Sequence, residues 1–254
     1  MRTVAPEPLV AQGVSRRVRR TGAWWEPRWA VVPVGVVALA FVAFALPPYL
    51  TLDPGRSRIP VPAGAPTYYP ALVAHTVFGS VAMLTCCLQM WSWLRRRHPL
   101  AHERIGRVYV FGGVVPAGLM GLTIGAISPF GPVLRASNVL LALVWLGVTI
   151  TGFRMARRDR LYEHRRWMVR SFALTMSVIT NRVWSVIWFL TLSPQLSTTF
   201  GGSETLMVQA IAGLSGWLGW VIPLLAAELW LERGTYRRPA ASMAARGTSQ
   251  VAST

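Results

Sequence analysis

Two histidines in arginine-rich segments are the residues of this sequence best suited to hold a redox cofactor. His102 and His164 are expected to begin two helices on the same side of a helical bundle, so that their imidazoles face one another. Imidazole is a normal axial ligand of haem iron, and helix bundles hold cofactors between facing side chains. Gly106, one turn after His102, leaves room for a porphyrin. The pattern predicts axial ligands to one haem b; the alternative is a pair of interfacial histidines that contact lipid phosphates or cap helices.

Five polar residues within apolar segments form a second candidate site: His75, Asn138, Asn181, Arg182 and Gln209. Arg182 follows His164 by 18 residues, about five helical turns, so both lie on one helix face. We expect that face to point into the bundle, because a charge at this depth must pair or reach water. The five residues predict an outward-opening cavity for an anion, a quinone carbonyl or a haem propionate. The alternative is a structural network in which His75 is the hydrogen-bond partner of Arg182.

Established catalytic motifs do not occur in this sequence. It contains no phosphate-binding Walker sequence, no HExxH zinc sequence and no GxSxG nucleophile sequence. Its two cysteines, Cys86 and Cys87, are adjacent within an apolar stretch, so neither a disulfide nor a zinc site is expected. The sequence therefore indicates no particular catalytic residue and no metal site.

The elements that position these residues are expected to be transmembrane helices. Hydrophobic residues make up 53% of the 254 residues and charged residues only 14%, whereas a soluble domain carries about 25% charged residues. Each apolar stretch is close to the roughly 20 residues that cross a 30 Å hydrocarbon core as a helix. Six such spans are predicted, at about 29–50, 69–94, 108–128, 133–153, 167–192 and 205–231. The expected fold is an all-α polytopic bundle, because lipid-exposed backbone must satisfy its own hydrogen bonds.

The ends of the chain are expected to lie outside this bundle. Residues 1–28 are predicted to be a disordered basic arm, and residues 232–254 a disordered tail. One alternative concerns the first span, because Ala43-Phe44-Ala45 resembles a signal-peptidase site. Cleavage there would leave five spans.

The arginines predict the orientation of the bundle. All 26 basic residues are arginine; 22 lie in the N-terminal arm, the 95–107 and 154–170 loops and the C-terminal tail, and three lie in the other loops. By the positive-inside rule both termini are cytoplasmic, and the bundle lies in the cytoplasmic membrane. The net charge of +17 does not indicate a nucleic-acid partner, because the arginines flank apolar stretches and do not form one soluble surface. The expected partner is the lipid bilayer.

Two motifs resemble those of a known family. They are His102-x-x-x-Gly106-Arg107-x-Tyr109 and His164-Arg165-Arg166-Trp167-Met168-x-Arg170-Ser171, followed by Arg182. Together they resemble a bacterial family of predicted membrane proteins known only as a domain of unknown function, over residues 70 to 230. A weaker similarity is to the haem-bearing helical cores of membrane b-type cytochromes and ferric reductases. Those cores carry histidine pairs at two levels, whereas here Asn138 stands where a partner for His75 is wanted.

The sequence predicts an integral membrane protein of unassigned activity with an internal polar site, and three more specific classes of function stay open. The first is a redox protein that binds one haem b, or a quinone, through His102 and His164. The second is a small permease whose substrate occupies the cavity around His75, Arg182 and Asn138. The third is an accessory subunit without chemistry that docks on a larger membrane complex through its small-residue faces. All three are integral membrane proteins.

Overall fold

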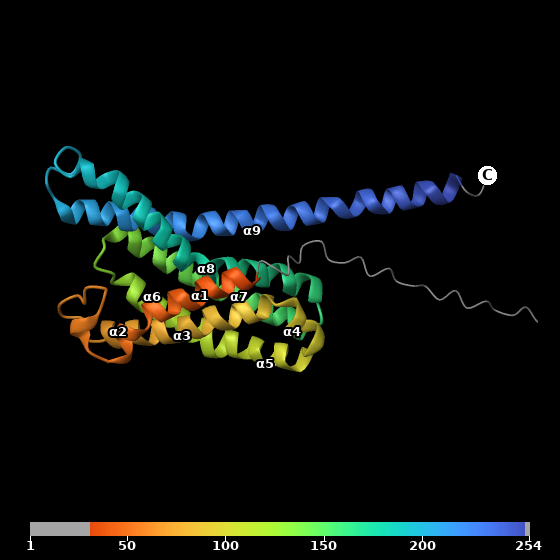
Figure 1. Cartoon of the computed structure of the whole chain (residues 1–254), viewed down its shortest axis with the longest axis horizontal. Helices are drawn as coiled ribbons and strands as arrows, with labels where there is room; N and C mark the ends of the chain where they lie inside the picture. The colour runs from red at the N-terminus through yellow and green to blue at the C-terminus, as the bar shows by residue number, and fades with distance from the viewer. Residues whose placement is uncertain (1–30, 252–254) are drawn as a thin grey trace, which may run out of the picture.

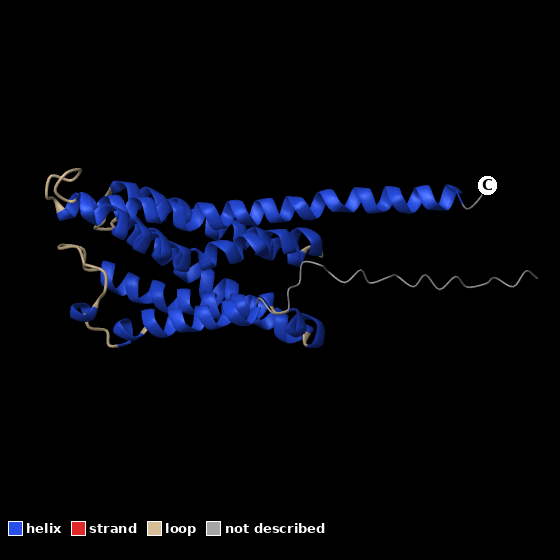
Figure 2. Ribbon diagram, turned by 45° about the horizontal axis from the view of Figure 1, so that its top comes forward, coloured by secondary structure: helices blue, strands red, loops and turns tan. Residues whose placement is uncertain are grey.

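The computed structural model describes residues 31–251, with side chains for residues 32–233. Helices and short connecting loops make up this part of the chain (Figure 2). The long helices are α3 (Tyr68–Met90), α7 (Pro132–Arg157), α8 (Leu161–Leu192) and α9 (Glu204–Val251). A further long unit consists of α5 (Pro99–Tyr109) and α6 (Val115–Ala126), which the π-helical segment η2 (Val110–Val114) joins. The shorter elements are α1 (Val31–Ala45), α2 (Pro47–Leu50), η1 (Pro54–Arg56), α4 (Ser92–Arg97) and η3 (Ser193–Gln195). The predicted N-terminal arm lies outside the described residues, and α9 extends into the region of the predicted tail.

Five helices are long and apolar enough to cross a membrane, which supports the expected all-α membrane bundle. They are α3, the continuous α5–η2–α6 unit, α7, α8 and the first part of α9. Within the described residues, the first predicted span is interrupted: its first helix, α1, has 15 residues and a length of about 22 Å. It ends just before Pro47-Pro48, because proline lacks the N–H that continues a helix.

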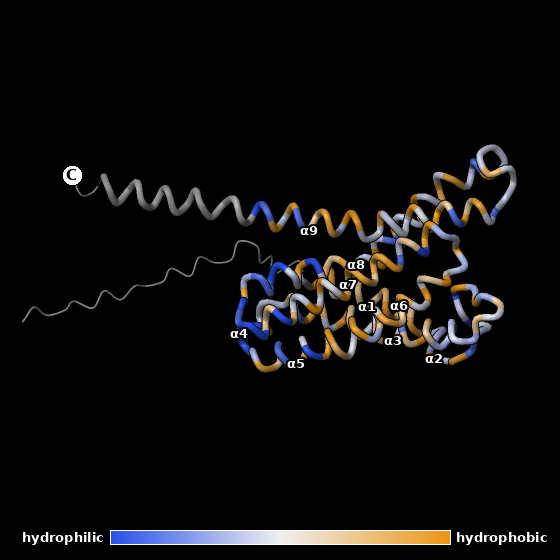
Figure 3. The backbone as a smooth tube through the Cα atoms, turned by 180° about the vertical axis from the view of Figure 1, so that it is seen from behind, coloured by the Kyte–Doolittle hydropathy of each residue, from blue (hydrophilic) through white to orange (hydrophobic). Residues whose placement is uncertain are grey.

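Consecutive helices run in alternating directions, so the connections gather at two ends of the bundle (Figure 1). The α4–α5 and α7–α8 turns, which carry the arginines, lie at one end, and the strongly hydrophilic residues collect there (Figure 3). The loop after α1, the α6–α7 loop and the α8–α9 loop lie at the other end. The arginine-rich connections thus share one face of the bundle, as the sequence predicts.

A core of side chains from α3, α5, α7, α8 and α9 fills the centre of the bundle. It includes Ala82, Tyr109, Trp145, Leu174 and Trp220, all buried. Within this core α3 packs on α5 and α6, α7 on α6 and α8, and α8 on α9. The contact between α3 and η2 is especially close.

The π-helical segment brings the α5–η2–α6 unit against α3. Its wide turn is closed by the Val115 N–H, which donates to the carbonyl of Val110. Pro116 follows and has no N–H with which to continue the ordinary helical ladder. A β-carbon at Gly113 would lie only 2.8 Å from the α-carbon of Ala82, so only glycine allows this approach. Such π-bulges are often found at functional sites.

Candidate functional site

The structure brings His102 and His164 together at the arginine-rich end. The two imidazoles lie close enough to interact electrostatically. Their helices, α5 and α8, run in the same direction. His102 and His164 are 62 residues apart in the sequence, and Tyr109 and Ser171 are separated by the same number. The hydroxyl groups of Tyr109 and Ser171 are hydrogen-bonded directly. Seven residues are about two turns, so the histidine pair lies roughly 10 Å nearer the end of the bundle than the Tyr109–Ser171 contact.

A hydrogen bond holds the ring of His164 in one orientation. Its Nδ1 lies 2.8 Å from the carbonyl oxygen of Gly152 on α7. A ring that donates from Nδ1 to a backbone carbonyl keeps Nε2 unprotonated and available, which is the usual arrangement of a ligating histidine. His102 differs, because its Nδ1 is buried and has no hydrogen-bond partner among the side chains described. Its backbone carbonyl accepts a hydrogen bond from the Gln89 side chain, at 2.8 Å.

Two glycines stand beside this pair. A β-carbon at Gly106 would lie 3.6 Å from the amide group of Gln89, in ordinary contact. A β-carbon at Gly152 would lie 2.9 Å from the sulfur of Met168 and 3.1 Å from the Cβ of Trp167. The space next to the histidines is therefore bounded by backbone on two sides and filled by the side chains of Gln89, Trp167 and Met168.

Two turns deeper, a network of buried polar side chains joins α5, α7 and α8. Tyr109 contacts Ser171 and Thr175, Thr149 contacts Ser171, and the Trp145 indole N–H donates to Thr175. The Thr175 hydroxyl also donates to the carbonyl of Ser171 at 2.7 Å. Each hydroxyl has one proton. Every hydroxyl proton has an acceptor in one arrangement of donors: Thr149 donates to Ser171, Ser171 donates to Tyr109 and Tyr109 donates to Thr175.

Ion pairs join α8 to α9 on the side of α8 away from this network. Arg170 donates two hydrogen bonds to the carboxylate of Glu228, one of them from Nη2 to Oε2 at 2.8 Å. Arg166 donates to the carboxylate of Glu232 at 2.5 Å. The Arg170 side chain is only 15% exposed and the Glu228 side chain 37%. A two-point guanidinium–carboxylate contact of this kind is strong and directional.

We predict that Glu228→Gln lowers the free energy of unfolding by about 1 to 3 kcal/mol, because it leaves a largely buried guanidinium without its counter-charge. Denaturation of the purified protein in mixed micelles measures the change. Glu163→Gln is the control, since Glu163 meets Arg160 at 3.5 Å in an exposed pair that should contribute less than about 1 kcal/mol. If both variants lost the same free energy of unfolding, the Arg170–Glu228 pair would contribute no more to stability than an exposed ion pair.

The residues of the second candidate site lie between different pairs of helices. The Nδ1 of His75 is 2.8 Å from the carbonyl of Ala117 on α6, so its partner is backbone and not Arg182. Its ring also lies against Gly121, where a β-carbon would come within 3.2 Å. One turn further along α6, Gly125 receives Asn138 of α7, with 2.9 Å to its Cβ. His75 and Asn138 therefore flank adjacent turns of α6.

Asn181 and Gln209 contact other glycines. Asn181 lies against Gly219 of α9, where a β-carbon would come within 2.8 Å of its Cβ. Gln209 lies against Gly131, which precedes α7 with a φ of +88° that strongly favours glycine. The four residues of the predicted cavity other than Arg182 are thus each fitted against a glycine, and they lie on four different helices, α3, α7, α8 and α9.

Arg182 is exposed on α8, whereas Ser171 and Thr175 are buried. The expectation that the face shared by His164 and Arg182 points into the bundle is therefore wrong for Arg182. The outer half of α8 packs on α9 through Asn181, and the next residue points about 100° further around the helix. Arg182 has no ion-pair partner among the described side chains.

Sequence reasoning missed the hydrogen-bond network and the α8–α9 ion pairs. Tyr109 and Ser171 close the two motifs, at the same distance from His102 and His164, and that equal spacing was the available signal. Glu228 and Glu232 are two of the chain's nine acidic residues, so their pairing with arginine could also have been sought.

The fold and this site define a class: an α-helical integral membrane protein with five long apolar helices and a polar interior. The chain belongs to the family of predicted membrane proteins described as DUF2306, whose model matches residues 72–231. The matched region covers all the candidate residues, and the predicted membership of a family of unknown function is confirmed. No curated protein and no solved structure matches the chain.

Proposed function

We propose that this protein is a membrane redox protein that binds one haem b between His102 and His164. The observation that carries the proposal is the placement of the two histidines opposite one another on parallel helices, two turns from the Tyr109–Ser171 contact. Two imidazoles on facing helices are the donor set of a six-coordinate b-type haem. The orientation of His164 by Gly152 is the outer-shell contact that ligating histidines generally have.

The surroundings of the pair suit a porphyrin once side chains move. Gly106 on α5 and Gly152 on α7 leave room beside the pair that the side chains of Gln89, Trp167 and Met168 occupy. Gln89 and Met168 are flexible and fill the remaining space, so they must change rotamer to admit the ring. The charge of Arg95 lies close enough to interact with His102, and it suits the carboxylates of a porphyrin. When bound, haem supplies one-electron transfer between its ferric and ferrous forms.

The test is an optical spectrum of the detergent-purified full-length protein, oxidised and then reduced with dithionite. We expect a Soret band and sharp α and β bands on reduction. A colourless protein from haem-replete cells would contradict haem binding. Quinone binding at the same pair, transport through the His75, Asn138 and Arg182 region, or an accessory role in a larger complex would then be tested in turn.

We also propose six spans with both termini in the bacterial cytoplasm, supported by the gathering of arginine-rich turns at one end (Figure 3). In a background with Cys86→Ala and Cys87→Ala, we expect Ser57→Cys to react with a membrane-impermeant maleimide in intact cells. Asp159→Cys, in the α7–α8 turn, should react only after the cells are lysed. The opposite labelling pattern would reverse the orientation.

A further inference from the structure

One face of α5 carries an arginine between exposed apolar residues. Leu100 is 69% exposed and Val108 47% exposed, and Arg104, between them at four-residue spacing, is exposed as well. Residues four apart lie above one another on a helix, so the three form one outward stripe. In a membrane helix such a stripe faces lipid. Arg104 thus lies where the helix passes from aqueous to apolar surroundings.

This arginine has no acidic partner within the part of the chain described. Glu103, its neighbour, is bonded to Arg107 at 2.5 Å. Arg97, at the end of α4, likewise has no ion pair among the described side chains. A long basic side chain near the end of a membrane helix extends its charge to the interface, where it needs an anion or water. Two such arginines border the same short turn.

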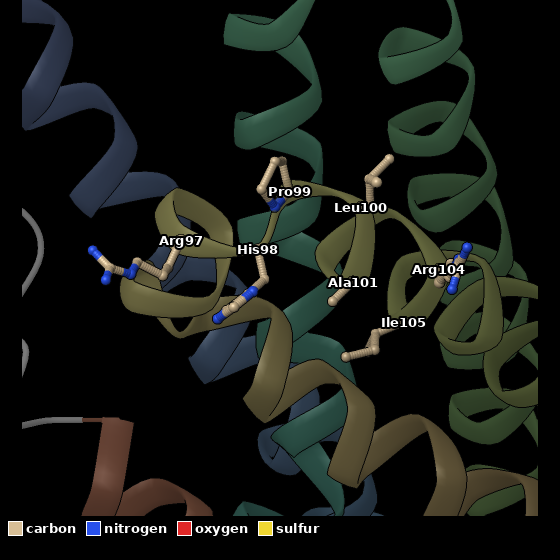
Figure 4. Close-up of a pocket in the computed structure, with 7 residues that line it drawn as sticks. All are labelled: Arg97, His98, Pro99, Leu100, Ala101, Arg104 and Ile105. Carbon is tan, nitrogen blue, oxygen red and sulfur yellow. The ribbon is translucent and has the colours of Figure 1, made fainter.

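A cavity of about 540 Å³ lies at this turn. Arg97 and Arg104 stand on opposite sides of it, with Ala101 and Ile105 between them (Figure 4). Leu100 also lines it, so its surface is mainly apolar while its borders carry two positive charges. A molecule that fits this combination has an anionic group next to a hydrocarbon chain.

We propose that this cavity binds an anionic phospholipid, with its phosphate at Arg104, the charge of Arg97 on the other side, and the start of an acyl chain over Leu100 and Ile105. Basic pockets at the membrane surface recognise anionic headgroups by this chemistry. The site is separate from the His102–His164 pair, and the proposal does not depend on haem binding. The α4–α5 turn is thus, in this proposal, a binding site for anionic lipid.

The experiment is native mass spectrometry of the delipidated full-length protein, titrated with phosphatidylglycerol or with phosphatidylcholine of the same acyl chains. We expect the wild-type protein to prefer phosphatidylglycerol. Each arginine near a membrane surface is worth about 1 kcal/mol toward anionic lipid. Arg104→Gln should therefore weaken phosphatidylglycerol binding about fivefold, and the double variant with Arg97→Gln about thirtyfold.

The control is Arg157→Gln with Arg158→Gln, which removes two exposed arginines from the α7–α8 turn at the same end of the bundle. It should leave phosphatidylglycerol binding unchanged. An equal loss in this control would reduce the effect to overall charge and overturn the site. So would equal binding of the two lipids by the wild-type protein, or full competition by inorganic phosphate, which would identify a free anion as the occupant.

Discussion

Changing His102 or His164 to alanine is expected to abolish the Soret band and the reduced α and β bands of the purified protein. Each variant would remove one of the two imidazoles proposed to hold the iron, and a haem held mainly by its iron ligands in a detergent micelle would be lost when one ligand is missing. The haem-to-protein ratio, measured from the pyridine haemochrome spectrum, should approach one for the wild type and zero for both variants. Size-exclusion chromatography shows whether the variants remain folded.

His98→Ala is the matched control, because His98 lies in the same arginine-rich segment and is exposed. Its ring lies edge-on to Trp93, with 5.1 Å between centroids. Its backbone carbonyl accepts from the His102 N–H at 3.0 Å, a main-chain contact that the alanine variant keeps. This variant should keep the full haem content. Loss of haem in His98→Ala, or its retention in His164→Ala, would show that the two imidazoles do not hold the iron.

Tyr109→Phe is expected to lower the free energy of unfolding by about 1 to 3 kcal/mol. Tyr109 is 1% exposed, and its hydroxyl accepts from Ser171 and donates to Thr175. Phenylalanine fills the same volume but leaves the Ser171 proton without an acceptor in an apolar interior, which is costly. Unfolding in mixed micelles measures the loss, and a double-mutant cycle with Ser171→Ala separates the shared contact from the rest.

Tyr69→Phe provides the comparison. Tyr69 is 8% exposed, and its buried hydroxyl has no hydrogen-bond partner among the described residues. Removing a hydroxyl that is already unsatisfied should be neutral or slightly stabilising. If Tyr69→Phe and Tyr109→Phe were equally destabilising, the loss would reflect the tyrosine side chain in general and not the network.

The sequence predicted the features that depend on one helix at a time. Long apolar stretches follow from the thickness of the bilayer, and arginine-rich turns alternate with arginine-poor loops because charge is excluded from its interior. The proximity of His102 and His164 could also be predicted, because both lie near the start of helices that run in the same direction. The shorter α1 follows from Pro47 and Pro48, whose effect on a helix is local.

The features that depend on which helices are neighbours could not be predicted in the same way. Depth alone placed His75, Asn138 and Asn181 at one level, but His75 and Asn138 lie against glycines of α6 and Asn181 lies against a glycine of α9. The spacing of polar residues in the sequence predicts which residue faces the bundle interior only to within one position along the helix. That uncertainty is enough to move Arg182 from the interior to the surface, with Asn181 taking the contact with α9.

The fixed direction of the hydroxyl network has a bearing on the energetics of the cell. Reversing it would leave the Thr149 proton without an acceptor among the described residues, and the Trp145 indole can only donate. Thr175 would have to give up its bond to the Ser171 carbonyl as well. A hydroxyl row that cannot be reset cannot pass one H⁺ after another. These hydroxyls therefore form no path by which successive protons could leak across this part of the bundle.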